Sequence, residues 1–422
     1  MRYRAVRPLP LLLGIVICCM GLGCSNSEFT ESAGWEDIIV SQDSNEVIGF
    51  SKLDYLPFDD SEYPYAGIPR VVIVTENYRE IRDRETEIPA KLQVWGADAP
   101  ESEIMNLTIK GRGNTTWSYP KKPFAIKFNE KQAFLGMPKA KKWVMLANYR
   151  DRTLIRNAVA LEIARRTSPN WVPRGQFADI FLNNKFIGNY YICEKIEVNQ
   201  NRLNLESNGV LLEFDKHYDE EFQFRTAIGN YPTIIKYPKE PTDEQFHNIE
   251  NFVNDFVESV YNQHEYNHVD INSFVDYFIV NEIAQNSEIQ SPKSFFSYID
   301  NKGNLTAGPV WDFDYETFTV SKRGLRNIYG FLFKDLISNN LFKKQILLQW
   351  DNYKNTLPFI FDYIDSLSTN LKASNEQNHL LWPITYSYGL VGDENESYET
   401  AIRMLKSSLE ARIKELDMLF SL

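Results

Sequence analysis

The chain has 422 residues, with 45 Lys and Arg against 57 Asp and Glu, so its formal charge is −12. Hydrophobic residues make up 43% and charged residues 24% of the chain, a globular composition that excludes disorder for most of its length. The acidic balance argues against a general nucleic-acid-binding protein, because such proteins present a basic face.

Residues 1–23 have the pattern of a signal peptide, with Arg residues ahead of an apolar stretch at 11–20. Small residues then precede Cys24, which resembles a bacterial lipobox. The resemblance implies cleavage before Cys24 and its lipidation, and an ordinary signal with an incidental Cys is the alternative. Lipidation would anchor the chain in the bacterial cell envelope, and the following Ser25 favours the outer membrane. Polar residues 24–66 are then expected to form a flexible tether.

The first half of the remaining chain, residues 67–240, has the pattern of a β-rich region. Asp151 is expected to cap its one helix, at 152–166. Cys193, the one Cys left after Cys24, stands in an apolar run and is expected to be buried as a small hydrophobe. The strands are expected at 71–74, 107–111, 124–128, 141–146, 177–182, 186–196, 210–214 and 233–237.

Residues 241–422 are predicted to be mainly helical, so the fold class expected for residues 67–422 is α+β. One hairpin interrupts the helices, with strands at 294–299 and 305–311. The helices are expected at 242–262, 271–286, 339–372 with a break at Pro358, and 396–421.

The sharpest chemical pattern is Trp311-Asp312-Phe313-Asp314, directly after the second strand of that hairpin. Paired carboxylates at a strand end suit a hard cation such as Mg²⁺ or Mn²⁺. The same pair also fits a glycosidase acid and base, or a solvated turn with salt bridges. No spacing of His residues predicts a zinc site, and no Gly-x-Ser-x-Gly motif predicts a serine hydrolase.

A second pattern is a strand, a Gly-containing loop and another strand, over residues 110–128. Backbone N–H groups and Lys side chains in this order can approach phosphate oxygens, although a basic surface hairpin has the same appearance.

Two further carboxylates end predicted elements. Glu194 ends a strand and is positioned to orient a Lys, or is simply solvated, and Glu288 follows the helix at 271–286. Glu288 precedes the hairpin and Asp312, which is the chain order of base and metal ligand in protein kinases.

Taken together, these segments resemble the spore coat protein H kinase family, the CotH-like atypical kinases. The resemblance covers about residues 70–320 and implies a divergent, two-lobed protein-kinase-like fold that phosphorylates Ser or Thr of exported proteins with Mg²⁺ (or Mn²⁺) and ATP. It rests on Arg112-Gly113-Asn114-Thr115-Thr116-Trp117, Pro120-Lys121-Lys122-Pro123, Asn148-Tyr149-Arg150-Asp151 with Leu154-Ile155-Arg156-Asn157, Glu194-Lys195 and Trp311-Asp312-Phe313-Asp314.

By position, the resemblance makes Asp312 and Asp314 the metal-binding acids and Glu288 the base. Lys122 or Lys127 would meet phosphate, and Glu194 would pair with that Lys. The residues expected on the loop that covers the nucleotide are Arg112, Asn114 and Thr115.

The sequence leaves two other functions open. The pattern leads us to expect Asp where Glu288 stands, and no Asn for a second metal follows it. A non-catalytic surface binding or adhesion module on the same fold is therefore the main alternative, and a carbohydrate-active enzyme that uses Asp312 or Asp314 is the other.

Overall fold

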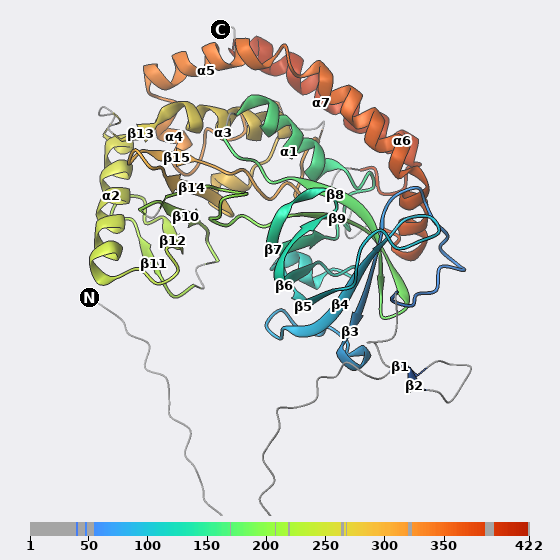
Figure 1. Cartoon of the computed structure of the whole chain (residues 1–422). Helices are drawn as coiled ribbons and strands as arrows, with labels where there is room; N and C mark the ends of the chain where they lie inside the picture. Colours follow the sequence, from blue (N-terminus) through green and yellow to red (C-terminus); the bar gives the residue numbers. More distant parts are fainter. Residues whose placement is uncertain are drawn as a thin grey trace, which may run out of the picture. The chain divides into compact units, whose positions relative to one another are not determined.

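The computed structural model divides the chain into residues 1–52 and residues 53–422 (Figure 1). It describes residues 55–420, except 169, 207, 218–219, 263–265, 267, 320–322 and 385–391, together with two short paired strands, β1 (Ile39–Val40) and β2 (Val47–Ile48). The predicted signal peptide and Cys24 lie outside the described residues. β1 and β2 lie within the segment predicted as a tether, and its last residues are packed, since Leu56 is fully buried.

A closed seven-stranded barrel forms the first part of the second unit (Figure 1). β5 alternates between a buried and a more polar face, with Leu107 and Ile109 in the core, whereas β3 is buried along its whole length. A parallel pairing of β3 with β8 closes the barrel. The strands, in spatial order, are β3 (Arg70–Thr75), β4 (Ile88–Trp95), β5 (Met105–Gly111), β6 (Phe124–Phe134), β7 (Met137–Leu146), β9 (Lys185–Glu194) and β8 (Gly175–Leu182).

The second sheet has six strands and crosses the predicted boundary at residue 241. Three of its strands come from before that point and three from after it, so the β-rich and helical parts share one sheet. In spatial order they are β11 (Gln223–Arg225), β12 (Pro232–Tyr237), β10 (Val210–Phe214), β14 (Phe295–Ile299), β15 (Leu305–Ala307) and β13 (Val269–Asp270).

The helices pack around α3 (Ile271–Ala284), which is buried continuously from Ser273 to its end. A helix that is hydrophobic on all sides belongs in a core, and α3 contacts α1, α5, α7 and β15. None of the helices in the described part of the chain combines the length and hydropathy needed to cross a membrane. The others are α1 (Arg156–Thr167), α2 (Asp243–Tyr261), α4 (Phe333–Leu336), α5 (Asn340–Tyr353), α6 (Pro358–Leu381) and α7 (Tyr398–Phe420).

The predicted α+β class is confirmed, with strands concentrated in the first half and helices in the second. The break expected at Pro358 is also confirmed, because this residue is the first of α6. Cys193 is fully buried and unpaired, as expected.

Several predicted bounds were wrong, and two of them concern the segments around Asp151 and Asp312. α1 begins at Arg156 rather than 152, and Asp151 accepts a hydrogen bond from the Arg156 backbone N–H at 2.8 Å. The strand expected to run to residue 311 ends at Ala307, so Asp312 lies in a loop.

Candidate active site

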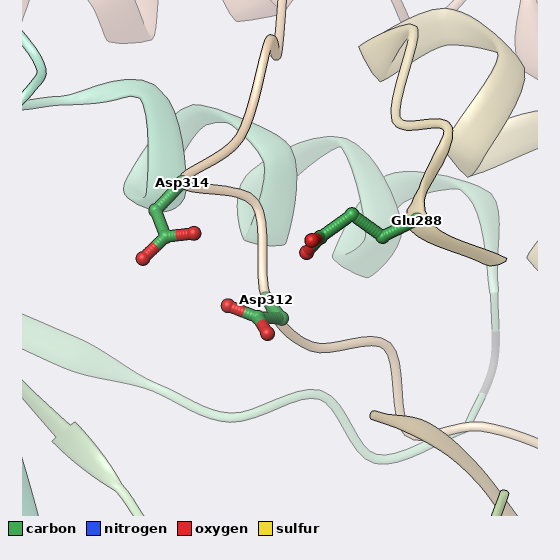
Figure 2. A group of neighbouring side chains, drawn as sticks. All are labelled: Glu288, Asp312 and Asp314. Atoms are coloured by element: carbon green, nitrogen blue, oxygen red, sulfur yellow. The ribbon is translucent and has the colours of Figure 1, made fainter. Parts of the chain in front are cut away.

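Three carboxylate side chains lie close together, one from the segment that follows α3 and two from the segment that follows β15. Glu288 begins the short 3₁₀ helix η4 (Glu288–Gln290), and Asp312 and Asp314 lie in the loop that follows β15. Each residue offers a carboxylate oxygen, and these oxygens all lie within 4.8 Å of one another. Figure 2 shows the three side chains pointing toward one another. The β14–β15 hairpin brings the two chain segments back together, as the order of the motifs predicted.

Asn286 fixes the distance between the two segments. Its side-chain N–H₂ donates to the Asp312 carbonyl at 3.2 Å and to Asn281 at 3.1 Å. Its side-chain oxygen accepts from the Glu288 backbone N–H at 3.1 Å. One amide side chain at the end of α3 therefore holds both the acid on η4 and the backbone at Asp312.

The three acids shift one another's protonation. Burial, and then the charge of neighbouring Asp312, raises the pKa of Glu288. Asp314 keeps an exposed surface, but desolvation within the cavity and the charges of Asp312 and Glu288 still raise its pKa well above the usual value. Such repulsion is relieved by a bound cation, and an all-oxygen donor set of carboxylates is the one that Mg²⁺ and Mn²⁺ prefer. The residues present therefore fit a divalent cation.

Cationic groups flank this acidic cluster. Lys293 forms an ion pair with Glu288. Arg112 lies in the loop between β5 and β6, and its positive charge lowers the pKa of both Asp312 and Asp314, whereas desolvation raises them. No hydrogen bond or ion pair of the Arg112 guanidinium is seen within the described residues.

A cavity of about 250 Å³ joins the acids to the loop between β5 and β6. All three residues predicted on that loop line it, namely Arg112, Asn114 and Thr115, and so do Glu288, Asp312 and Asp314. Asn114 also accepts a hydrogen bond from Arg84 at 2.6 Å, which joins this loop to the connection between β3 and β4. The structure therefore brings six of the residues predicted from the sequence to one cavity.

The structure does not bring the predicted Lys and Glu194 to this cavity, and these placements correct the sequence interpretation. Lys122 donates to the Trp117 carbonyl at 2.8 Å, and Lys127 is half-exposed, 3.8 Å from Glu87. Neither lines the cavity. Glu194 is fully buried, but it pairs with Arg174 at 2.8 Å rather than with a Lys.

Sequence reasoning missed Lys121, which lines the cavity and is fully buried. Its ammonium donates to the carbonyls of Ala147 and Asn189 and to the Asn378 side chain on α6. Burial lowers its pKa well below the usual value. Two adjacent Lys residues before a strand give no local signal as to which one points inward.

Residues 109–416 match the family described as CotH kinase protein. The chain belongs to the CotH kinase family. A comparison with curated proteins found no match. The matched region covers most of the chain. It includes both the β5–β6 loop and the acidic cluster, so all residues that line the cavity lie within it.

Proposed function

We propose that this CotH family member is an atypical protein kinase that transfers the γ-phosphoryl group of ATP to Ser or Thr of exported proteins. The observation that supports the proposal is the cluster of Glu288, Asp312 and Asp314, whose oxygens lie within 4.8 Å, across a cavity from Arg112. An acidic cation site facing an Arg is the arrangement that phosphoryl transfer needs, since its catalysis is mainly positioning and charge stabilisation.

In this proposal Asp312 and Asp314 hold Mg²⁺ or Mn²⁺, which would neutralise phosphate charge. Arg112 binds phosphate oxygens, because it lines the same cavity as the acids and the guanidinium fork matches the geometry of a phosphate. Asn114 and Thr115 border the phosphates from the β5–β6 loop.

The chemical step needs a base near the acceptor hydroxyl. The hydroxyl oxygen bonds to the γ-phosphorus, the bond from that phosphorus to the bridging oxygen breaks, and ADP leaves. The hydroxyl proton passes to Glu288, whose carboxylate Lys293 orients through an ion pair.

The proposed setting is the bacterial cell envelope. The lipobox-like residues before Cys24 support lipid anchoring, and the following Ser25 supports the outer membrane. The substrates proposed on this basis are exported or surface proteins that reach the same compartment.

The first test is thermal unfolding of residues 25–422 with and without ATP plus Mg²⁺ or Mn²⁺. A ligand at 100 times its Kd adds about 2.7 kcal/mol to the free energy of unfolding, a shift that such a scan resolves. Arg112→Gln and Asp314→Asn should lose the shift, whereas the matched control Lys127→Gln should keep it. Loss of the shift in the control, or retention in Asp314→Asn, would contradict the site.

Turnover separates the kinase from a non-catalytic binding module. The ion pair of Glu288 with Lys293, and a Glu where the family pattern leads us to expect Asp, favour the module as the second candidate. A kinase incubated with envelope proteins and γ-labelled ATP should transfer label to protein, and Glu288→Gln should abolish the transfer without removing nucleotide binding. Nucleotide binding without any transfer would support the module.

A further inference from the structure

The loop that carries Asp314 has a strained backbone. Asp312, Glu316 and Phe318 all have positive φ angles, of 67°, 51° and 58°. The left-handed region is unfavourable for side chains other than Gly, and such conformations persist only where the surroundings impose them. Something outside the loop must therefore hold the acids in place.

The first turn of α1 supplies two of these contacts. The Asn157 side-chain oxygen accepts a hydrogen bond from the Phe313 backbone N–H at 3.2 Å. Arg156 donates from Nε to the Thr317 carbonyl, also at 3.2 Å. The two contacts bracket Asp314, and the Thr317 hydroxyl closes the turn by donating to the Phe313 carbonyl at 2.8 Å.

The other nitrogens of Arg156 reach two carboxylates. Nη1 lies 3.2 Å from Asp151, in the turn before α1, and Nη2 lies 2.9 Å from Asp393, in the segment between α6 and α7. Arg156 and Asp393 are buried, with 6% and 1% of their surfaces exposed. A planar guanidinium can make all three contacts at once because its donors are fixed in a fork, and a Lys ammonium cannot.

We infer that Arg156 is a positioning residue that links the segment between α6 and α7 to the acidic cation site. It holds the carbonyl three residues after Asp314, and Asp393 and Asp151 hold Arg156. The inference deepens the proposed function and rests on it for the cation. The link itself is a property of the protein without a ligand and can be measured separately.

The experiment compares three single substitutions in the full chain after Cys24. Arg156→Lys keeps the charge but loses the fork, and Asp393→Asn weakens the outer contact. Arg152→Lys is the matched control, because Arg152 also joins the turn before α1 to distant residues, at Asn375 on α6 (2.8 Å) and at the Glu396 carbonyl between α6 and α7 (3.0 Å). Within the described part of the chain, Arg152 makes no hydrogen bond or ion pair with residues 312–317.

Two readouts are taken from each variant. The first is amide hydrogen exchange of a peptide over residues 310–319 in cation-free protein, where faster exchange reports a released loop. The second is the Kd for Mn²⁺ alone, from titration of free Mn²⁺. Outer contacts to a metal site typically change affinity about 10- to 100-fold.

We expect faster exchange and a Kd raised at least about 10-fold in Arg156→Lys, with a smaller change in Asp393→Asn. The control should match the wild type in both readouts even if its midpoint of thermal unfolding falls. Unchanged exchange in Arg156→Lys would overturn the inference. Exchange could be faster in Arg156→Lys while the wild-type protein does not bind Mn²⁺ at all. That result would support the contact between Arg156 and the loop, but it would contradict the cation site and count against the proposed function.

Discussion

The buried ion pair of Arg412 with Glu282 is predicted to stabilise residues 324–327, which follow the loop that carries Asp312 and Asp314. Arg412 on α7 donates to the Glu282 carboxylate, to the Glu282 carbonyl at 2.8 Å and to the Gly324 carbonyl at 2.9 Å. Glu282 also accepts from the backbone N–H groups of Arg326 and Asn327, at 2.9 and 2.6 Å. The two paired side chains have 1% and 0% of their surfaces exposed.

Arg412→Met removes the cation and leaves a buried carboxylate with only backbone donors. Breaking a buried pair from one side costs about 3–5 kcal/mol of unfolding free energy. For a folded unit of this size, that loss lowers the midpoint of thermal unfolding by about 4–6 °C. The control is Arg403→Met on the exposed side of α7, which should change the unfolding free energy by less than about 0.5 kcal/mol.

The size of the loss should depend on pH. Burial raises the pKa of Glu282, and Arg412 opposes that rise. Without Arg412 the folded carboxyl takes up a proton more readily than the unfolded one, so the variant gains relative stability at low pH and loses it as pH rises through the folded pKa. We therefore expect a larger loss at pH 8 than at pH 5. Equal losses at both, or a double variant with Glu282→Gln that is no better than Arg412→Met alone, would refute the reasoning.

Two further predictions concern Asp276 and Gly330. Burial raises the pKa of Asp276 from 3.8 to about 7, so its stabilising contribution is lost progressively as pH rises between these two values. Asp276→Asn should therefore gain more stability relative to the wild type at pH 8 than at pH 5 in thermal scans, and an equal difference at both would contradict this. A Cβ at Gly330 would lie 2.2 Å from the Gln290 carbonyl oxygen. Gly330→Ala should therefore lower the free energy of unfolding in urea by about 1–3 kcal/mol. An unchanged urea midpoint would contradict this, because it would mean that the backbone at Gly330 moves without cost.

The sequence predicted those features that depend on local periodicity. The alternation in residues 124–128 and the amphipathic spacing of residues 242–262 predicted β6 and α2, and the order of Glu288, the hairpin and Asp312 resembled that of a base and a metal ligand in kinases. Each of these relies on residues close in the chain or joined by one short hairpin, where the period of the pattern decides which face is buried.

Partners from distant strands could not be predicted in this way. Glu194 pairs with Arg174 because the register of β8 with β9 sets Gly175 opposite Cys193, and no local pattern specifies that register. Lys121 and Lys122 differ only in direction, and the inward one is decided by acceptors as far away as Asn378. α1 starts later than expected because Leu154, at a φ of 64°, still belongs to the turn before it.

The end of α3 shows why polar residues interrupt an otherwise apolar helix. Asn281 accepts from Asn286, which holds both Asp312 and Glu288, and the next residue, Glu282, holds the backbone at Arg326 and Asn327. Buried polar groups at these positions weaken a core unless every one is paired, so packing alone does not account for them. Their pairing orders the two segments that flank the acidic cluster. A buried polar pair inside an otherwise apolar helix is therefore a second sequence signal for the site, in addition to the carboxylates of the cluster.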